Sequence, residues 1–252
     1  LASVAEPEAE KLLAAGGGSV KRALLLARGL PEERVESLLA RHCGNLRAAL
    51  LDTARSLVQA QGLDGLTLRA VAERLGVSRS AIYRHYSSKD ELLGQIIMEG
   101  FEQLRAATAE AAQQRAKRTE SCPLDQLHHM GLAYIRFAVE HADLYDLMFH
   151  PSLIGRSCDT VKMASLRSYE VLTDMLQRCQ QAGQIKAGEP HRQAFAIWAS
   201  LHGLVSLCRG RPPHAVPEAT LEGGFEMLLE QLMAGLATQQ QWRSVLQTDA
   251  SG

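Results

Sequence analysis

The side chains best suited to binding chemistry lie close together between positions 67 and 89. This stretch carries hydroxyl, guanidinium, imidazole and ammonium groups, and it has no acidic residue between Ser78 and Lys89. Such a positive, donor-rich set of side chains suits phosphate oxygens and base edges. The chemistry it favours is therefore contact with DNA. The residues expected to make this contact are Thr67, Arg69, Ser78, Arg79, Ser80, Tyr83, Arg84, His85, Tyr86 and Lys89.

Two short helices joined by a tight turn would position these side chains. Thr67 and Ser78 are of types that cap helix N-termini, and Gly76 can take the left-handed conformation that often ends a helix. Apolar residues follow each cap at helical spacing. The inward faces are Leu68, Val71, Ala72 and Leu75 in the first helix and Val77, Ala81 and Ile82, closed by Tyr83 and Tyr86, in the second. Arg79 and Ser80 then lie at the outward start of the second helix, where a helix in the major groove meets base edges.

A third helix is predicted to begin directly afterwards. Ser88 and Glu91 have the spacing of a capping box, which places Lys89 in the first turn. A lysine is mildly unfavourable at the positive end of a helix. It fits better if an anion such as a DNA phosphate lies there, and we expect Thr67, Tyr83, Tyr86 and Lys89 to contact phosphates.

Residues 46–95 resemble the DNA-binding domain of the tetracycline-repressor (TetR) family. The resemblance rests on the run LLDTARSLVQAQGLDGLTLRAVAERLGVS, on Ile82 to Tyr86, and on KDELL from Lys89. The family's usual aromatic after the histidine is Phe, whereas this chain has Tyr86. A helical hairpin with a solvated basic face is the alternative interpretation. The resemblance implies a helix-turn-helix that binds double-stranded operator DNA.

Composition favours an all-α fold. The chain has 252 residues, 46% of them hydrophobic, few aromatics, and a net charge of −1, so the basic character is local. Its five cysteines are scattered and never form a C-x-x-C pair, which argues against a disulfide scaffold or a zinc site. No apolar run is long enough for a membrane helix, and no signal peptide is apparent. We expect a soluble, cytoplasmic protein.

Four regions are predicted along the chain. Residues 1–44 form an N-terminal extension whose Gly16 to Gly18 run is interpreted as a flexible linker, because no G-K-S/T follows it. An accessory arm, an early start site and appended expression sequence are alternatives for this extension. Residues 45–95 form the DNA-binding domain, residues 96–238 a helical ligand-binding and dimerisation domain, and residues 239–252 a tail.

Six further helical segments are expected after the recognition helix. The helix opened by Ser88 runs well past position 107, and others lie near 123–138, 144–149, 158–182, 190–208 and 218–236. His128 and His129 are adjacent on one helix, so their side chains diverge and are predicted to be surface histidines rather than metal ligands. Gly203 lies in mid-helix, where close approach of another helix would justify it.

The motif formed by Trp198, His202 and Gly203 is similar to the signature of one TetR-family C-terminal domain type, the W-x-x-x-H-G (WHG) type. Residues 144–149, LYDLMF, also look like that subgroup. A ligand site for a small apolar effector is typically an apolar cavity with a few polar groups. The predicted ligand contacts are Tyr134, Phe137, Met148, Phe149, Trp198 and His202, and a tightly packed core is the alternative role for the same residues.

The last predicted helix carries a long apolar stripe. In the family that the chain resembles, the last two helices of each subunit form a four-helix bundle at a twofold axis. The resemblance therefore implies a homodimer, which two DNA half-sites also require. The expected interface residues are Leu201, Leu221, Phe225, Leu228 and Leu232.

The function predicted from these patterns is a ligand-responsive transcriptional regulator, a repressor released from its operator by a small apolar effector. A helical enzyme and a protein-interaction module without DNA binding are the alternatives. The enzyme is disfavoured because the sequence shows no nucleophile motif, cofactor loop or metal-ligand spacing. No catalytic residue, cofactor or metal is therefore predicted.

Overall fold

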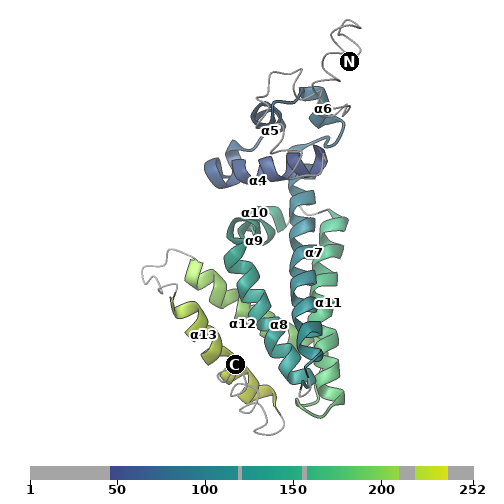
Figure 1. Cartoon of the computed structure of the whole chain (residues 1–252), viewed down its shortest axis with the longest axis vertical. Helices are drawn as coiled ribbons and strands as arrows, with labels where there is room; N and C mark the ends of the chain where they lie inside the picture. Colours follow the sequence, from purple (N-terminus) through teal and green to yellow (C-terminus); the bar gives the residue numbers. More distant parts are fainter. Residues whose placement is uncertain (1–45, 119–120, 155–157, 210–218, 238–252) are drawn as a thin grey trace, which may run out of the picture. The chain divides into compact units, whose positions relative to one another are not determined.

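The computed structural model describes residues 46–118, 121–154, 158–209 and 219–237, and all their regular elements are helices apart from one isolated bridge between Ile185 and Ala237. The chain divides into two compact units, one ending at Ile96 and the other beginning at Ile97. Figure 1 labels the helices. The predicted all-α fold is confirmed. No helix in the described ranges is long and apolar enough to cross a membrane.

The first unit contains helices α4 (Leu46–Gly65), α5 (Leu68–Leu75) and α6 (Arg79–Tyr83), together with the start of α7 (Lys89–Ala116). Its turns form through local capping. The Thr67 side chain accepts a hydrogen bond from the Ala70 N–H at 3.0 Å, and the Ser78 side chain accepts one from the Ala81 N–H at 3.2 Å. Gly76 ends α5 with φ 73°, which glycine adopts without steric cost. These three sequence predictions are confirmed.

Gly62 interrupts α4 with φ 72° and ψ −178°, so the helix kinks there. The inward residues of α4, α5 and α6 then share one core with the start of α7. Its largest fully buried members are Leu50, Leu51, Leu66, Ile82, Tyr86, Leu92 and Ile96. Tyr83, which we expected to close this core beside Tyr86, is instead 57% exposed. That expectation was wrong because Tyr83 ends a helix of only five residues, on its outer side.

The N-terminus of α7 has only half of the predicted capping box. The Ser88 hydroxyl accepts a hydrogen bond from the Glu91 N–H at 3.1 Å, as expected. The Glu91 carboxylate does not return to Ser88 but accepts from the N–H and the hydroxyl of Ser87, both at 2.7 Å. These bonds lower the pKa of Glu91 and satisfy donors one residue further from the helix.

The second unit contains the rest of α7 and six further helices. They are α8 (Pro123–Glu140), α9 (Ala142–Met148), α10 (Pro151–Ile154), α11 (Asp159–Gln181), α12 (Pro190–Arg209) and α13 (Ala219–Leu236). Helices α8, α11 and α12 pack on one another, and α13 packs on α12. Pro123 begins α8 and Gly183, at φ 67°, follows the end of α11, both at the predicted positions.

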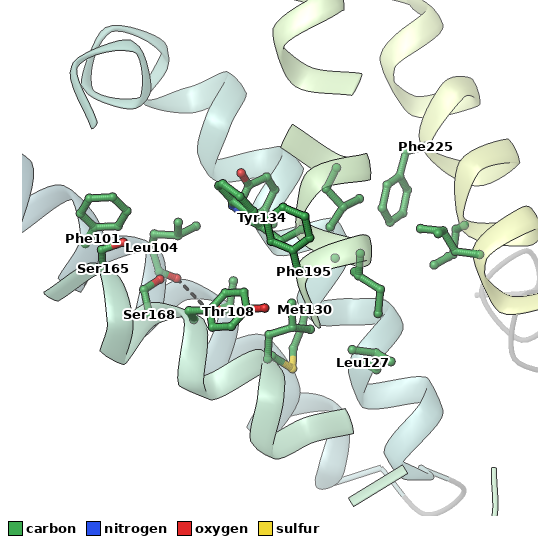
Figure 2. Close-up of a pocket in the computed structure, with 18 of the residues that line it drawn as sticks. Phe101, Leu104, Thr108, Leu127, Met130, Tyr134, Ser165, Ser168, Phe195 and Phe225 are labelled. Carbon is green, nitrogen blue, oxygen red and sulfur yellow. Dashed lines mark hydrogen bonds between the residues drawn. The ribbon is translucent and has the colours of Figure 1, made fainter. Parts of the chain in front are cut away.

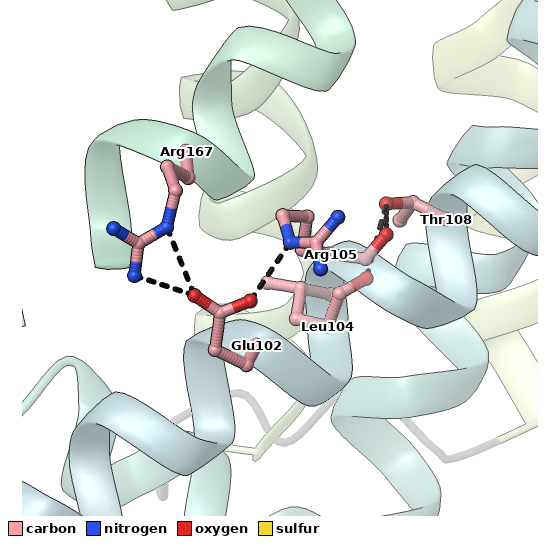
Figure 3. Close-up of polar contacts among 5 residues, drawn as sticks. All are labelled: Glu102, Leu104, Arg105, Thr108 and Arg167. Atoms are coloured by element: carbon pink, nitrogen blue, oxygen red, sulfur yellow. Dashed lines mark hydrogen bonds and ion pairs between the residues drawn. The ribbon is translucent and has the colours of Figure 1, made fainter. Parts of the chain in front are cut away.

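Polar contacts join α7 to α11 within the second unit (Figure 3). The Arg167 guanidinium donates two hydrogen bonds to one oxygen of the Glu102 carboxylate, at 3.0 and 2.6 Å, and Arg105 donates to the other oxygen at 2.8 Å. Bonds from Arg105 and Arg167 hold the pKa of Glu102 below its usual value. These ion pairs of Glu102 are partly exposed, so we expect them to contribute at most about 1 kcal/mol to stability. They also fix the register of α7 against α11.

The sequence expectation for His128 was wrong, and the one for Gly203 is not met within the chain. His128 is not at the surface: it is 5% exposed and stacks on Phe225 with ring centroids 6.1 Å apart. Gly203 was expected to allow the close approach of another helix, and within the described part of the chain no side chain or other element lies within 4 Å of where its Cβ would be. The close approaches occur at other glycines instead. A Cβ at Gly131 would lie 3.2 Å from the Phe225 ring, and one at Gly100 would collide with Met148.

Candidate functional site

The first candidate site is the outer face of α5 and α6. Most of the residues predicted to contact DNA are exposed there: Thr67, Arg69, Arg79, Ser80, Tyr83, Arg84 and His85. The same short segment buries Ala81 and Ile82, so burial of the apolar residues fixes which side chains point outward. Arg69 is already paired with Glu73 at 2.6 Å. The site therefore presents a row of donors on a face held by the unit's own core.

Besides Thr67, which caps α5, and Arg69, three of the predicted contacts have other roles in the structure. Ser78 caps α6, and its hydroxyl also lies 3.0 Å from that of Ser80. The Lys89 ammonium donates to the backbone carbonyl of Leu63, which ties the start of α7 to the end of α4. Tyr86 is only 1% exposed, and its hydroxyl accepts a hydrogen bond from Arg47 at 3.3 Å. Burial of the Tyr86 ring does not favour the phosphate contact predicted for it.

The second candidate site is a cavity of about 240 Å³ inside the second unit, between α7, α8, α11, α12 and α13 (Figure 2). Its wall is mainly aliphatic and aromatic. The residues labelled in the figure are Phe101, Leu104, Thr108, Leu127, Met130, Tyr134, Ser165, Ser168, Phe195 and Phe225. Leu166 and Phe195 line the cavity and are 52% and 59% exposed, so they mark its opening between α11 and α12.

The predicted ligand contacts divide into two groups. Tyr134, Phe149 and Trp198 line the cavity, whereas Phe137, Met148 and His202 do not. Phe137 packs on His141, with ring centroids 4.9 Å apart. Met148 is buried against Gly100. The sequence reasoning missed Phe101, which lines the cavity and meets Phe149 edge to face at 5.6 Å.

Behind the wall, three side chains form a hydrogen-bonded chain. The Tyr134 and Tyr145 hydroxyls lie 2.6 Å apart, and the Tyr145 hydroxyl lies 2.6 Å from Nδ1 of His202. Burial raises the pKa of Tyr134 to about 12, although hydrogen bonds with Tyr145 and Trp198 oppose the rise. Burial also lowers the pKa of His202. Both shifts favour the neutral forms, so this chain supplies polarity without charge.

Two of the predicted dimer contacts lie in the subunit's own interior. Leu201 and Phe225 are 6% and 2% exposed, and both line the cavity. Leu232 also lines the cavity, and Leu228 is half-buried. Leu201 and Phe225 are buried within the subunit, where Phe225 contacts α8, and this burial does not favour the interface contact predicted for them. The side chain of Leu221 lies outside the described residues.

Among the described residues, no group of three or more His, Cys, Asp or Glu side chains could hold a metal ion. Four cysteines in these ranges, Cys122, Cys158, Cys179 and Cys208, are free thiols. Within the described ranges, neither site therefore offers a recognisable metal centre.

Comparison with known proteins relates both units to one family. The family profile described as "Bacterial regulatory proteins, tetR family" matches residues 50–96, and the profile described as "Tetracyclin repressor-like, C-terminal domain" matches residues 127–232. The second description is not that of the WHG type, so this finer assignment stays a prediction.

Individual relatives agree with the profiles. An HTH-type transcriptional regulator of Mycobacterium tuberculosis is 37% identical over 59 residues, which are 23% of this chain and 25% of the relative. The tetracycline repressor protein class C of Escherichia coli is 47% identical over 47 residues, 19% of this chain and 22% of the relative. The chain thus matches a quarter or less of the length of these two regulators.

A solved structure extends the likeness along the chain. A protein of unknown function from Rhodococcus sp. RHA1 has a TM-score of 0.68 and 28% sequence identity, and the match covers 77% of this chain and 96% of that one. The helix-turn-helix, the helical second unit and the two profile matches in the same order lead to one conclusion. This chain belongs to the TetR family of bacterial regulatory proteins.

Proposed function

We propose that this protein is a transcriptional regulator that binds double-stranded operator DNA through the outer face of α5 and α6. The observation that carries the proposal is the division of α6 into buried Ala81 and Ile82 and exposed Arg79, Ser80 and Tyr83. That division presents donors at the start of a recognition helix, where base edges are read. Family membership and the named regulators among its relatives support the same function.

Within this face, Arg79 and Ser80 would read bases, while Thr67, Tyr83 and Lys89 would contact phosphates. Thr67 and Lys89 lie at helix N-termini, where backbone N–H groups attract anions. Lys89 keeps two further N–H donors beyond the one that binds the Leu63 carbonyl. No residue is given a catalytic role.

The effector would be a small apolar ligand held in the cavity of the second unit, and its binding would release the DNA. Helix α7 belongs to both units, since it begins at Lys89 and contributes Phe101, Leu104 and Thr108 to the cavity wall. A ligand that binds the DNA-incompetent state more tightly shifts the equilibrium toward it, typically with a coupling free energy of about 1–3 kcal/mol. The protein would then act as a ligand-released repressor.

Two half-sites call for a homodimer, and the exposed faces of α12 and α13 suit its interface. On α12, small and apolar residues recur at helical spacing on the side away from the cavity: Ala196, Ala199, Gly203 and Leu207. On α13, Gly223 and the 64% exposed Met227 lie opposite Phe225. The open space above Gly203 would then admit a helix of the second copy.

A substitution on this face tests the dimer. Ala199→Arg should give folded monomers at micromolar concentration in sedimentation, because an arginine there would place a charge between apolar helices. Ala182→Arg, at an exposed position after α11, is the matched control and should stay dimeric. A dimeric Ala199→Arg variant would refute this interface.

The DNA experiment starts from the full chain and a random pool of duplexes. Selected duplexes are then measured by fluorescence anisotropy at several salt concentrations, with Arg79→Ala as the variant. We expect a preferred sequence bound at least about a thousand-fold more tightly than unrelated duplexes. Equal affinity for all duplexes, or none, would refute the proposed function.

A further inference from the structure

The cavity wall excludes charged ligands. Among the described residues that line it, none carries a charged side chain. An ionised carboxylate or phosphate that enters an apolar site without a counter-charge loses its hydration and gains no partner. The ligand group that faces this wall is therefore uncharged.

The cavity also bounds the ligand's size. Its volume is about 240 Å³, whereas a dry apolar cavity of about 150 Å³ in an engineered protein holds benzene. The larger volume suits a molecule of roughly two fused rings or an aliphatic skeleton of the same bulk. Aromatic rings such as Phe101, Phe149 and Trp198 provide flat apolar contacts for such a skeleton.

One buried polar group stands out in this wall. Tyr134 is 6% exposed, so a hydrogen bond to its hydroxyl is made away from water. The other hydroxyls are placed differently. Thr108 donates to the carbonyls of Leu104 and Arg105, Tyr169 donates to the carbonyl of His191, and Ser165 and Ser168 are half-buried beside the exposed Leu166. Tyr134 is thus the hydroxyl best placed to hold a ligand oxygen inside the cavity.

The hydrogen-bonded chain of Tyr134, Tyr145 and His202 determines whether Tyr134 has a lone pair or its O–H left for a ligand. If Nδ1 of His202 accepts from Tyr145, then Tyr145 accepts from Tyr134, and the Tyr134 oxygen, which also accepts from Trp198, keeps one lone pair for a ligand. If Nδ1 carries the proton, the donations reverse and Tyr134 offers its O–H. Either arrangement serves a neutral oxygen, as an alcohol donor or as a carbonyl acceptor.

We propose that the ligand is an uncharged, largely apolar molecule of about two fused rings whose single neutral oxygen lies against the Tyr134 hydroxyl. Tyr145 and His202 are positioning residues behind it and do not touch the ligand. This inference rests on the proposed function, in which the cavity holds the effector. It replaces the expected direct contact by His202 with an indirect one.

Three probes with one skeleton test the proposal: naphthalene, 2-naphthol and 2-naphthoate. Their affinities for the full chain are measured by equilibrium dialysis at neutral pH, without DNA. We expect 2-naphthol to bind about fivefold more tightly than naphthalene, as one net hydrogen bond provides. We expect 2-naphthoate to bind at least tenfold more weakly than naphthalene, because its carboxylate is desolvated. Equal or tighter binding of 2-naphthoate, or no binding of any probe, overturns the proposal.

Substitutions in the protein test whether the oxygen of 2-naphthol bonds the Tyr134 hydroxyl. Tyr134→Phe should abolish the preference for 2-naphthol and leave the naphthalene affinity unchanged, whereas a general loss of fold would lower both. Tyr145→Phe should reduce the same preference by loosening the hydroxyl of Tyr134. Ser200→Ala removes a hydroxyl that bonds the Ala196 carbonyl outside the cavity, and it should change neither affinity. Loss of the preference in Ser168→Ala instead of Tyr134→Phe would place the oxygen at the opening and refute the assignment.

Failure of the proposed ligand class can be distinguished from failure of the proposed function. Probe binding is read without DNA, and operator release is read separately by anisotropy with 2-naphthol added. Binding with the expected order but without release supports the ligand class and contradicts the effector role. Release without a preference for 2-naphthol supports the effector role and contradicts the ligand class.

Discussion

The two units use the same kinds of side chain in opposite ways. In the first unit, Tyr83 and the polar side chains of α6 point outward from a small core, and Tyr83 is 57% exposed. In the second unit, Tyr134 is 6% exposed and turns its hydroxyl toward other buried groups. The exposed site on α5 and α6 depends on short-range helix capping, whereas the cavity of the second unit depends on which helices pack together. The difference determines what a substitution does in each unit.

The largest expected difference between the units is in stability, when one aromatic ring is removed from each. Phe225→Ala should lower the free energy of unfolding by about 3–5 kcal/mol, because its ring is 2% exposed and packs on Gly131 and His128. Tyr83→Ala should change it by less than about 0.5 kcal/mol. Urea unfolding followed by circular dichroism measures both.

The DNA affinity of the Tyr83→Ala variant tests whether Tyr83 serves DNA binding rather than stability. Tyr83→Ala should weaken binding to the operator while the fold persists, since the exposed ring serves only the outer face. A Tyr83→Ala variant as unstable as Phe225→Ala would show that Tyr83 belongs to the core after all. The contrast between an outward and an inward site would then be lost.

The first unit could be predicted closely because its determinants are local. Thr67, Gly76 and Ser78 each act on backbone groups within a few residues, so residue type and spacing were enough to place the helix ends. The wrong predictions in the first unit also concerned contacts between residues close in sequence. The Glu91 carboxylate accepts from Ser87 rather than from the Ser88 N–H, and Tyr83 lies on the exposed side of a helix end.

The second unit could be predicted as helices but not as a site. Apolar spacing gave α8, α11 and α12, yet it cannot say which helix each stripe meets. Phe225 was therefore expected between subunits although it contacts α8 within the chain. Tyr145 escaped notice because its role depends on Tyr134 and His202, 11 and 57 residues away.

A pair of arginines gives the next largest effect, on DNA binding alone. Arg79→Ala should cost about 1–3 kcal/mol at the preferred sequence and relax the preference at one base pair. Arg69→Ala should cost less than about 1 kcal/mol, because Arg69 is already paired with Glu73 on an exposed surface. Anisotropy titrations on the selected duplex and on single-base variants separate the two. A uniform loss across all duplexes for Arg79→Ala would assign it to phosphate instead.

Lys89 tests whether a residue at the edge of the outward site has one role or two. Lys89→Ala should flatten the salt dependence of DNA binding by about one unit per subunit, as expected for one lost phosphate contact. It should also lower the thermal midpoint slightly, because the Leu63 carbonyl loses its donor. A lower midpoint with an unchanged salt slope would show that Lys89 only ties α7 to α4.

The smallest expected effect concerns the inward site and the protonation of His202. Burial lowers the pKa of His202 below its ordinary value of 6.5, so the unfolded chain takes up a proton there before the folded chain does. The neutral ring's contribution is complete above pH 6.5, and stability falls as the pH drops from 6.5 toward the lower folded pKa. His202→Gln, which cannot titrate, should lose less unfolding free energy than the wild type between pH 7.5 and 5.5. If the two proteins lose the same amount, or the wild type loses less, then His202 is not desolvated, and the polar chain behind Tyr134 is open to water rather than part of a dry wall.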